Sequence, residues 1–148
     1  MRRQQRILLF VLLLIPVLAF SRYLAENESD HNALTKLIER SYIHGAFMEM
    51  NVSDMRAGFQ PAFHFYGSEQ GALRDVSISE WLTSVERRKT TQDRFEIEHK
   101  IISIDITGTS ALAKVEIYQD GSLLFTDYLT CLKFTEGWKI MSKVYHRH

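Results

Sequence analysis

The chain has 148 residues, which fits one domain of ordinary size. Its 18 basic and 18 acidic side chains balance overall, but three arginines lie in residues 1–21 without an acid, so the remainder carries a formal net charge of −3. This mild acidity argues against a nucleic-acid-binding protein, and a single cysteine excludes an intramolecular disulfide.

Residues 1–21 have the pattern of an export signal. Three arginines precede a fourteen-residue apolar stretch, residues 7–20, and small residues near its end suit cleavage. A membrane-spanning helix needs about 20 residues, so the short stretch favours a signal peptide. An uncleaved signal anchor is the alternative, and the protein would then meet the membrane only through this leader. In both cases we expect a secreted or periplasmic protein.

The residues after the leader predict a linker and a first helix. Residues 22–30 are polar and are predicted to form a linker, so the domain should span residues 31–148. Ser29 or Asp30 can cap the helix, because both side chains accept hydrogen bonds from free backbone amides. The face of this helix that should be buried follows a helical spacing and comprises Leu34, Leu37, Ile38, Ser41, Tyr42 and Gly45.

Two further helices and a hairpin are predicted before the main sheet. A short helix capped by Ser53 should end before Pro61, because proline disfavours a helical conformation in the preceding residue. A glycine-bounded turn divides residues 62–76 into two short strands. Ser77 and Glu80 then form a capping box, in which each side chain accepts a hydrogen bond from the free backbone amide of the other residue. This pattern predicts the start of the third helix.

Residues 94–148 predict four strands joined by three tight turns. Asp120-Gly121 marks one turn, because both residue types tolerate positive φ in a hairpin loop. Apolar and polar residues alternate between the turns, as in an antiparallel meander. The apolar parity changes at Ile102-Ser103, which indicates a bulge. We therefore expect an α+β fold with three N-terminal helices packed on a strongly bent antiparallel sheet.

Alternation in the third of these strands predicts which side chains face the interior. Tyr128 shares a face with three large apolar residues, so we expect it to point inward. Asp127 lies on the opposite face and is expected to point outward. The partly apolar outer face predicts a homodimer contact, formed by Phe125, Leu129 and Met141.

Several residues are candidates for a functional site. His99 and Asp127 are the candidate catalytic bases, although His99 stands alone on an apolar face. His146 and His148 have a metal-binding spacing without a third ligand, so neither a metal site nor a cofactor is predicted. Cys131 is interpreted as a packed thiol. The residues predicted to line an apolar ligand cavity are Tyr42, Phe63, Phe65, Trp81, His99, Tyr128, Thr130 and Ser142.

The order of elements resembles the cone-shaped fold of the nuclear transport factor 2-like superfamily. Short sequence motifs over residues 34–148 narrow the resemblance to its branch named "putative lumazine-binding". These motifs are Tyr42-Ile43-His44-Gly45, Phe59-Gln60-Pro61, Ile102-Ser103-Ile104-Asp105-Ile106-Thr107-Gly108, Ala111-Leu112-Ala113-Lys114-Val115, Thr126-Asp127-Tyr128-Leu129, Gly137-Trp138-Lys139-Ile140 and Lys143-Val144-Tyr145-His146-Arg147.

The resemblance implies a pocket enclosed by the sheet and the helices, and in many members dimers formed through the outer face of the sheet. Members include ketosteroid isomerases and polyketide cyclases as well as non-catalytic proteins, so the fold alone does not give the function. Relatives often carry His-Pro-Asp where this chain has Gln60-Pro61-Ala62. This difference argues against proton transfer or metal binding at that corner.

Three functions follow from these patterns. The first is a non-catalytic module that binds a small apolar or aromatic ligand, in a hollow faced by Tyr128, Thr130 and His99. The second is an isomerase- or cyclase-type enzyme, which requires an inward carboxylate within hydrogen-bond reach of the cavity. The third is a structural, dimerising domain with a filled interior. The predicted outward direction of Asp127 favours the non-catalytic module.

Overall fold

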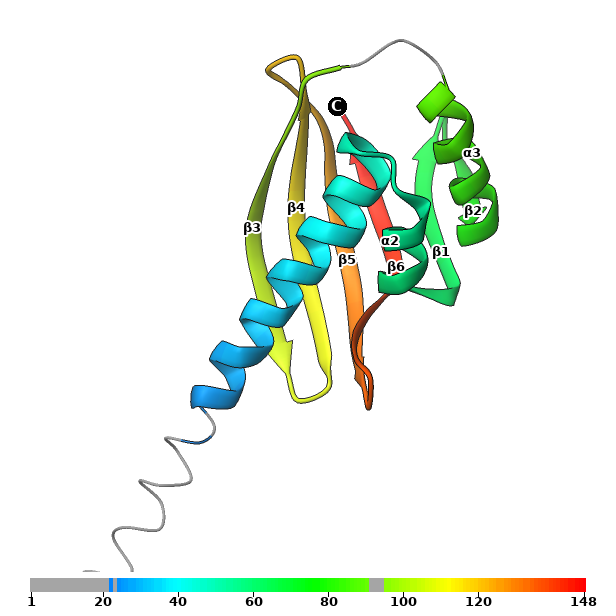
Figure 1. Cartoon of the computed structure of the whole chain (residues 1–148). Coiled ribbons are helices and arrows are strands. Elements are labelled where there is room, and N and C mark those ends of the chain that lie inside the picture. The colour runs from blue at the N-terminus through cyan, green and yellow to red at the C-terminus, as the bar shows by residue number, and fades with distance from the viewer. Residues whose placement is uncertain (1–21, 23, 91–94) are drawn as a thin grey trace, which may run out of the picture. The chain divides into compact units, whose positions relative to one another are not determined.

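The computed structural model describes residues 22, 24–90 and 95–148, so the predicted leader lies outside the described residues (Figure 1). The chain divides into two compact units, residues 1–32 and residues 33–148. In the first unit, residues 24–32 are α-helical. The helix therefore begins before the predicted caps, and residues 24–30 form helix where a linker was predicted. Alanine and glutamate in this segment favour helix.

The second unit opens with helix that changes its winding. Residues 33–37 are α-helical and lead into η1, a π-helix over Ile38–Met48. At its end the Glu49 amide donates to the His44 carbonyl at 2.9 Å, the i to i+5 bond of a π-helix. The next helix, α2 (Val52–Gly58), is capped by Asn51, whose side chain accepts from the amides of residues 53 and 54. The predicted cap at Ser53 was thus two residues late.

Close packing joins η1 to α2. A Cβ atom added at Gly58 would lie 2.1 Å from Ser41 Oγ, and one added at Gly45 would lie 2.9 Å from Met55 Cγ. Side chains larger than hydrogen do not fit at these contacts. The two glycines therefore let η1 and α2 approach closely enough to bury Tyr42 and Met55.

Six strands form one curved, mixed sheet with the order β2-β1-β6-β5-β4-β3 (Figure 1). All neighbouring strands are antiparallel except β1 and β6, which are parallel. Helix α3 (Ile78–Thr90) follows the β1–β2 hairpin. The α+β fold class with three helices and a bent sheet is confirmed. The strands are β1 (Phe59–Glu69), β2 (Ala72–Ser77), β3 (Ile97–Thr107), β4 (Ser110–Gln119), β5 (Ser122–Phe134) and β6 (Gly137–Arg147).

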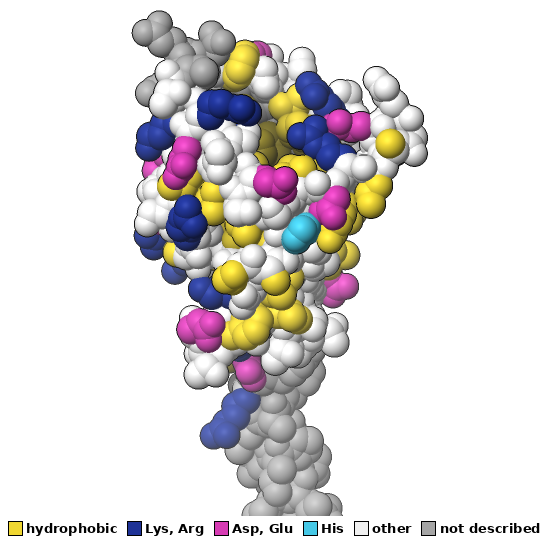
Figure 2. All heavy atoms as spheres, turned by 90° about the vertical axis from the view of Figure 1, so that its right-hand side faces the viewer, with side chains coloured by type: hydrophobic (Ala, Val, Ile, Leu, Met, Phe, Trp, Pro, Cys, Tyr) yellow, Lys and Arg dark blue, Asp and Glu magenta, His cyan; other side chains and the backbone are white. Residues whose placement is uncertain are grey.

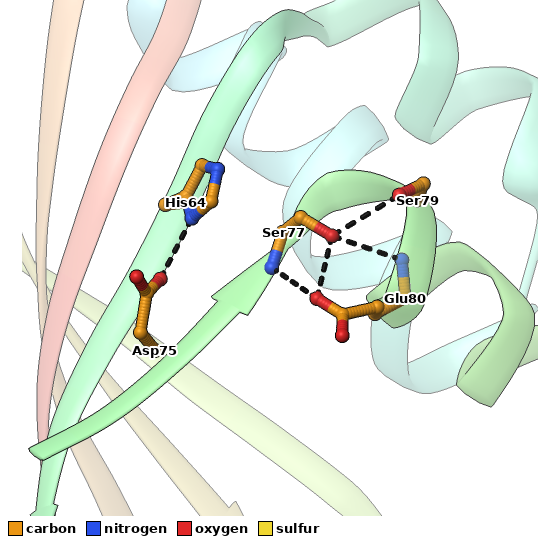
Figure 3. A network of polar contacts seen from close by, with 5 residues as sticks. All are labelled: His64, Asp75, Ser77, Ser79 and Glu80. Atoms are coloured by element: carbon orange, nitrogen blue, oxygen red, sulfur yellow. Dashed lines mark hydrogen bonds and ion pairs between the residues drawn. The ribbon is translucent and has the colours of Figure 1, made fainter.

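Local signals in the sequence predicted the turns and the start of α3 correctly. Asp120 and Gly121 have φ values of 50° and 78°, as a tight hairpin loop requires. The Ser77 amide donates to Glu80 Oε2 at 2.9 Å, and the Glu80 amide donates to Ser77 Oγ at 3.4 Å (Figure 3). These reciprocal bonds are the predicted capping box. The predicted bulge is also present, because the β3–β4 register shifts between Ile101 and Ser103.

A second bulge, in β6, was not predicted. Thr130 pairs with Ser142 and Cys131 pairs with Ile140, which leaves Met141 as an extra residue. The extra residue reverses the parity of the strand beyond it. Ile140 and Lys143 are therefore both buried.

The inner face of β5 is the reverse of the predicted one. Asp127 is fully buried and points inward with Leu129, whereas Tyr128 is 41% exposed on the outer face. The prediction was wrong because both faces of β5 carry large apolar residues, so alternation alone does not show which face is inside.

Among the described residues, no helix combines the length and apolar character needed to cross a membrane.

Candidate functional site

Three polar side chains meet inside the second unit, from η1, β5 and β6. The Tyr42 hydroxyl donates a hydrogen bond to Asp127 Oδ2. Lys143 Nζ lies 3.4 Å from Asp127 Oδ1 and 3.4 Å from the Tyr42 hydroxyl. Asp127 pairs with Tyr145 and Lys143 with Leu129, so the two charged residues are diagonal neighbours on one face of the β5–β6 ladder.

Burial changes the proton affinities of this cluster. Burial lowers the pKa of Lys143, and the nearby Asp127 charge partly offsets that shift. Burial also raises the pKa of Tyr42 well above its usual value, and the charge of Asp127 and the hydrogen bond to it add to this effect. Tyr42 is therefore a neutral donor at physiological pH. Asp127 Oδ1 is a buried side-chain atom without a hydrogen-bond partner among the described residues, at ion-pair distance from Lys143.

Aromatic rings surround the Lys143 ammonium. Nζ lies between 4.9 and 5.8 Å from the centroids of five rings. Ring faces attract a cation at this range, so the rings favour the charged form of Lys143 that burial opposes. The rings belong to Tyr42, Phe65, Trp81, Phe125 and Tyr145.

Lys143 reaches a cavity of about 220 Å³ that opens between β1, β2, α3, β5 and β6. Figure 2 shows a hollow on the face that carries β2 and α3, with apolar side chains in its depth and basic side chains on its rim. Three arginines line the cavity with Lys143, and the carboxylate among the lining residues, Glu69, is paired with Arg74 at 2.5 Å. The cavity is thus cationic and aromatic. Its lining includes Phe65, Glu69, Arg74, Trp81, Arg88, Phe125, Lys143, Tyr145 and Arg147.

A second cavity of about 650 Å³ shares part of this lining. Its walls are mostly apolar, with Met48, Met50 and Leu124 among them. The two cavities have Phe47, Arg88, Phe125 and Arg147 in common. A ligand held at Lys143 therefore has apolar space beside it.

Four of the predicted cavity residues lie in or behind the Lys143 cavity. Phe65 and Trp81 line it. Tyr42 and Phe63 are fully buried in the aromatic cluster behind these two rings.

The other four predicted residues lie elsewhere. Tyr128, Thr130 and Ser142 belong to the outer face of the sheet, where the Thr130 and Ser142 hydroxyls are hydrogen-bonded at 2.7 Å. Their predicted inward direction was wrong because the face of β5 was misassigned and the β6 bulge was missed. His99 Nε2 lies 2.9 Å from Glu39 Oε1, and His99 does not line either cavity.

Sequence reasoning missed Lys143 and the cavity arginines. Regular alternation placed Lys143 outside, and a signal for the β6 bulge is not evident in the strand. Arg88 lies in the last turn of α3, and its guanidinium donates to the Ala46 carbonyl at 3.1 Å. A second histidine–carboxylate pair lies on the β1–β2 hairpin, where His64 Nδ1 is 2.7 Å from Asp75 Oδ1 (Figure 3). Within the described part of the chain, no three His, Cys, Asp or Glu side chains gather as metal ligands.

A family model described as "Putative lumazine-binding" matches residues 29–146. The chain belongs to this family. The "Aldolase FrzH" of Cladobotryum sp is 26% identical over 122 residues, which cover 81% of this chain and 93% of that protein.

Solved structures of low sequence identity share the fold of this lumazine-binding family member. An NTF-2 like protein of unknown function from Silicibacter pomeroyi has a TM-score of 0.69 and 24% identity, with 82% of this chain and 98% of that chain covered. A "putative ketosteroid isomerase" from Shewanella frigidimarina has a TM-score of 0.60 and 20% identity, with 77% and 94% covered. The predicted membership of the nuclear transport factor 2-like superfamily is confirmed.

Proposed function

We propose that this member of the lumazine-binding family binds a small anionic molecule with an apolar or aromatic part in the Lys143 cavity. The observation that carries this proposal is the Lys143 ammonium, 5% exposed, held among aromatic rings at a cavity that three arginines also line. Guanidinium groups bind carboxylates and phosphates through charge-assisted hydrogen bonds. Aromatic walls with a few fixed polar groups are typical of small-molecule sites.

Matched probes test this binding. Phenylacetate and phenylacetamide have nearly the same shape, but only phenylacetate is an anion; lumazine is a third probe because of the family description. We expect phenylacetate to bind more tightly than phenylacetamide in calorimetry. Removing one charge-assisted hydrogen bond costs about 1.5–3 kcal/mol, so Arg147→Gln should weaken phenylacetate binding about tenfold or more.

The control for this variant is Arg56→Gln, because Arg56 is exposed on α2 and lines neither cavity. Unchanged phenylacetate affinity in the control is expected. Equal affinities for the acid and the amide, or no binding of any probe, would contradict the proposed anion site.

Catalysis next to a carbonyl group is the second candidate function. An inward carboxylate near the cavity was the feature that an isomerase- or cyclase-type enzyme requires, and Asp127 is that carboxylate, directly behind Lys143. The relative named as an aldolase supports the same class, because aldolases make or break a carbon–carbon bond beside a carbonyl. This second function would be supported if the protein turns over a fluorogenic β-hydroxyketone and the Lys143→Arg variant does not. His99 is not proposed as its base, since it lines neither cavity.

We also propose that the protein is exported and works outside the cytoplasm. The support is the basic and apolar pattern of residues 1–21. Expression of the full chain in a bacterium, followed by fractionation and mass spectrometry of the N-terminus, tests it. A cytoplasmic protein with an intact N-terminus would contradict export, and an intact N-terminus in the membrane fraction would indicate the signal anchor.

A homodimer formed through the outer sheet face is also proposed. Phe125 and Leu129, predicted for that face, point inward, so other residues form the contact. The outer face has a hollow of about 430 Å³, into which side chains of a second copy can insert. Leu112→Glu should convert dimers to monomers in sedimentation experiments, and a monomeric parent protein would contradict the proposal. Large exposed apolar residues of this face are Leu112, Tyr128, Leu132, Phe134 and Val144.

A further inference from the structure

We infer that Lys143 forms an imine with the carbonyl group of small anionic carbonyl compounds, of which keto acids are the simplest class. The inference rests on the proposed binding of an anion in the Lys143 cavity. It adds a covalent bond between a named atom of the protein, Lys143 Nζ, and the carbonyl carbon of the ligand.

The position of Lys143 suits an amine nucleophile. It is the single lysine among the described residues that line the two cavities. Its side chain is nearly fully buried, and a lysine held away from water beside other cationic groups is more readily deprotonated than a surface lysine. Arg74 and Arg88 line the same cavity, and their positive charges add to this effect.

The groups behind Lys143 supply a route for its proton. The ammonium transfers one proton to Asp127 Oδ1, which lies 3.4 Å away and has no hydrogen-bond partner among the described residues. The neutral nitrogen then attacks the carbonyl carbon, and the carbonyl electron pair moves to oxygen, which takes up one of the two protons of the attacking nitrogen. Loss of this oxygen as water, with a proton returned from Asp127, leaves the C=N bond. The balance is amine plus carbonyl giving imine plus water.

The surroundings also favour the product. A protonated imine is a cation at the position of the ammonium, so the five ring faces that attract Lys143 also attract it. The cavity arginines can hold a carboxylate beside the reacting carbonyl. A keto acid matches both features in one small molecule.

Reductive trapping tests the inference on the full chain. The protein is incubated with pyruvate and sodium cyanoborohydride, and peptide mass spectrometry locates the reduced adduct. We expect one adduct per chain, on Lys143, because reduction makes the imine irreversible. Acetone, which lacks the carboxylate, should label Lys143 about tenfold or more slowly, since it loses a charge-assisted hydrogen bond.

Two variants sharpen the result. Lys143→Arg keeps the cation but cannot form an imine, so it should abolish the adduct. Lys114→Arg is the matched control, because Lys114 lies over the Tyr128 ring on the outer face, and it should keep the adduct. Peptide mapping of the parent protein gives the answer even if Lys143→Arg does not fold.

Labelling spread over surface lysines, or an unlabelled Lys143 at saturating pyruvate, would overturn the inference. Phenylacetate has no ketone or aldehyde group, so its binding separates the two ideas. Phenylacetate binding without trapping leaves the proposed anion site in place and removes the imine. Failure of both removes the site itself.

Discussion

The Lys143 ammonium and the Asp127 carboxylate lie 3.4 Å apart at a depth where neither side chain has appreciable contact with solvent. A buried ion pair is weak evidence for stability, because desolvation of two charges offsets much of their attraction. Leaving one charge alone in the interior is far more costly. The pair therefore makes the two residues depend on each other, and it keeps an amine beside a cavity.

Asp127→Asn should destabilise the protein strongly, because it leaves the Lys143 ammonium without its counter-ion. Removing one partner of a buried pair costs about 3–5 kcal/mol of the free energy of unfolding. Urea denaturation measures this loss. Lys143→Met should also destabilise, because it leaves the Asp127 charge alone. The double variant should be more stable than either single one, and losses that simply add would refute the coupling.

The rate of pyruvate trapping should rise with pH, with a midpoint below the value of about 10.4 for a free lysine. Burial lowers the pKa of Lys143, so the folded protein releases this proton at lower pH than the unfolded chain does. Between the two pKa values the unfolded chain binds more protons, and the contribution of Lys143 to the free energy of unfolding therefore increases with pH.

Asp127→Asn provides the check on that pH profile. Asp127 raises the pKa of Lys143 against the larger effect of burial, so removing its charge should move the midpoint to still lower pH. Cyanoborohydride trapping at a series of pH values measures both midpoints. An unchanged midpoint in the variant would show that the trapped amine is not next to Asp127.

Cys131 should not react with a thiol reagent in the folded protein. Burial raises the pKa of this thiol to about 12, so almost no thiolate is present at pH 8. We expect no release of thionitrobenzoate from Ellman's reagent in buffer and one equivalent per chain in guanidinium chloride. Rapid labelling in buffer would show that β5 opens readily at this position.

Gly58→Ala should destabilise the protein through a clash between α2 and η1. The new methyl group would lie 2.1 Å from Ser41 Oγ, and overpacking of this kind costs about 1–3 kcal/mol. Gly71→Ala is the comparison, because a Cβ there meets nothing within 4 Å and its cost comes from a φ of +79° alone. Ser41→Gly should recover part of the loss in Gly58→Ala and none in Gly71→Ala. Equal behaviour of the two alanine variants in urea denaturation would contradict the packing explanation.

The elements that depend on neighbouring residues were predictable from the sequence. The Asp120-Gly121 turn and the Ser77–Glu80 capping box each need only a few adjacent residues, and both are present in the structure. The alternation of side chains along β5 also separated them correctly into two opposite faces, without showing which of the two faces is inside. The fold could be predicted because such local signals repeat along the chain.

The candidate site depends on relationships that the sequence does not show directly. Two apolar faces made the inner side of β5 ambiguous, so Asp127 was assigned to the wrong side. The extra residue in β6 depends on the pairing of β6 with β5, and regular alternation therefore misplaced Lys143. Arg74 and Arg88 come from two other elements, and their approach to Lys143 is a consequence of the whole fold.

The bulge at Met141 has a consequence for how relatives of this chain diverge. Without the extra residue in the pairing, the same strand would offer Ser142 and Val144 to the interior, and the amine would face solvent. One shift in backbone register thus exchanges the reactive group of the cavity while every amino acid in the strand stays the same. Relatives with this fold can therefore differ in chemistry through a one-residue insertion or deletion here, and the placement of a gap in an alignment at Met141 carries chemical meaning.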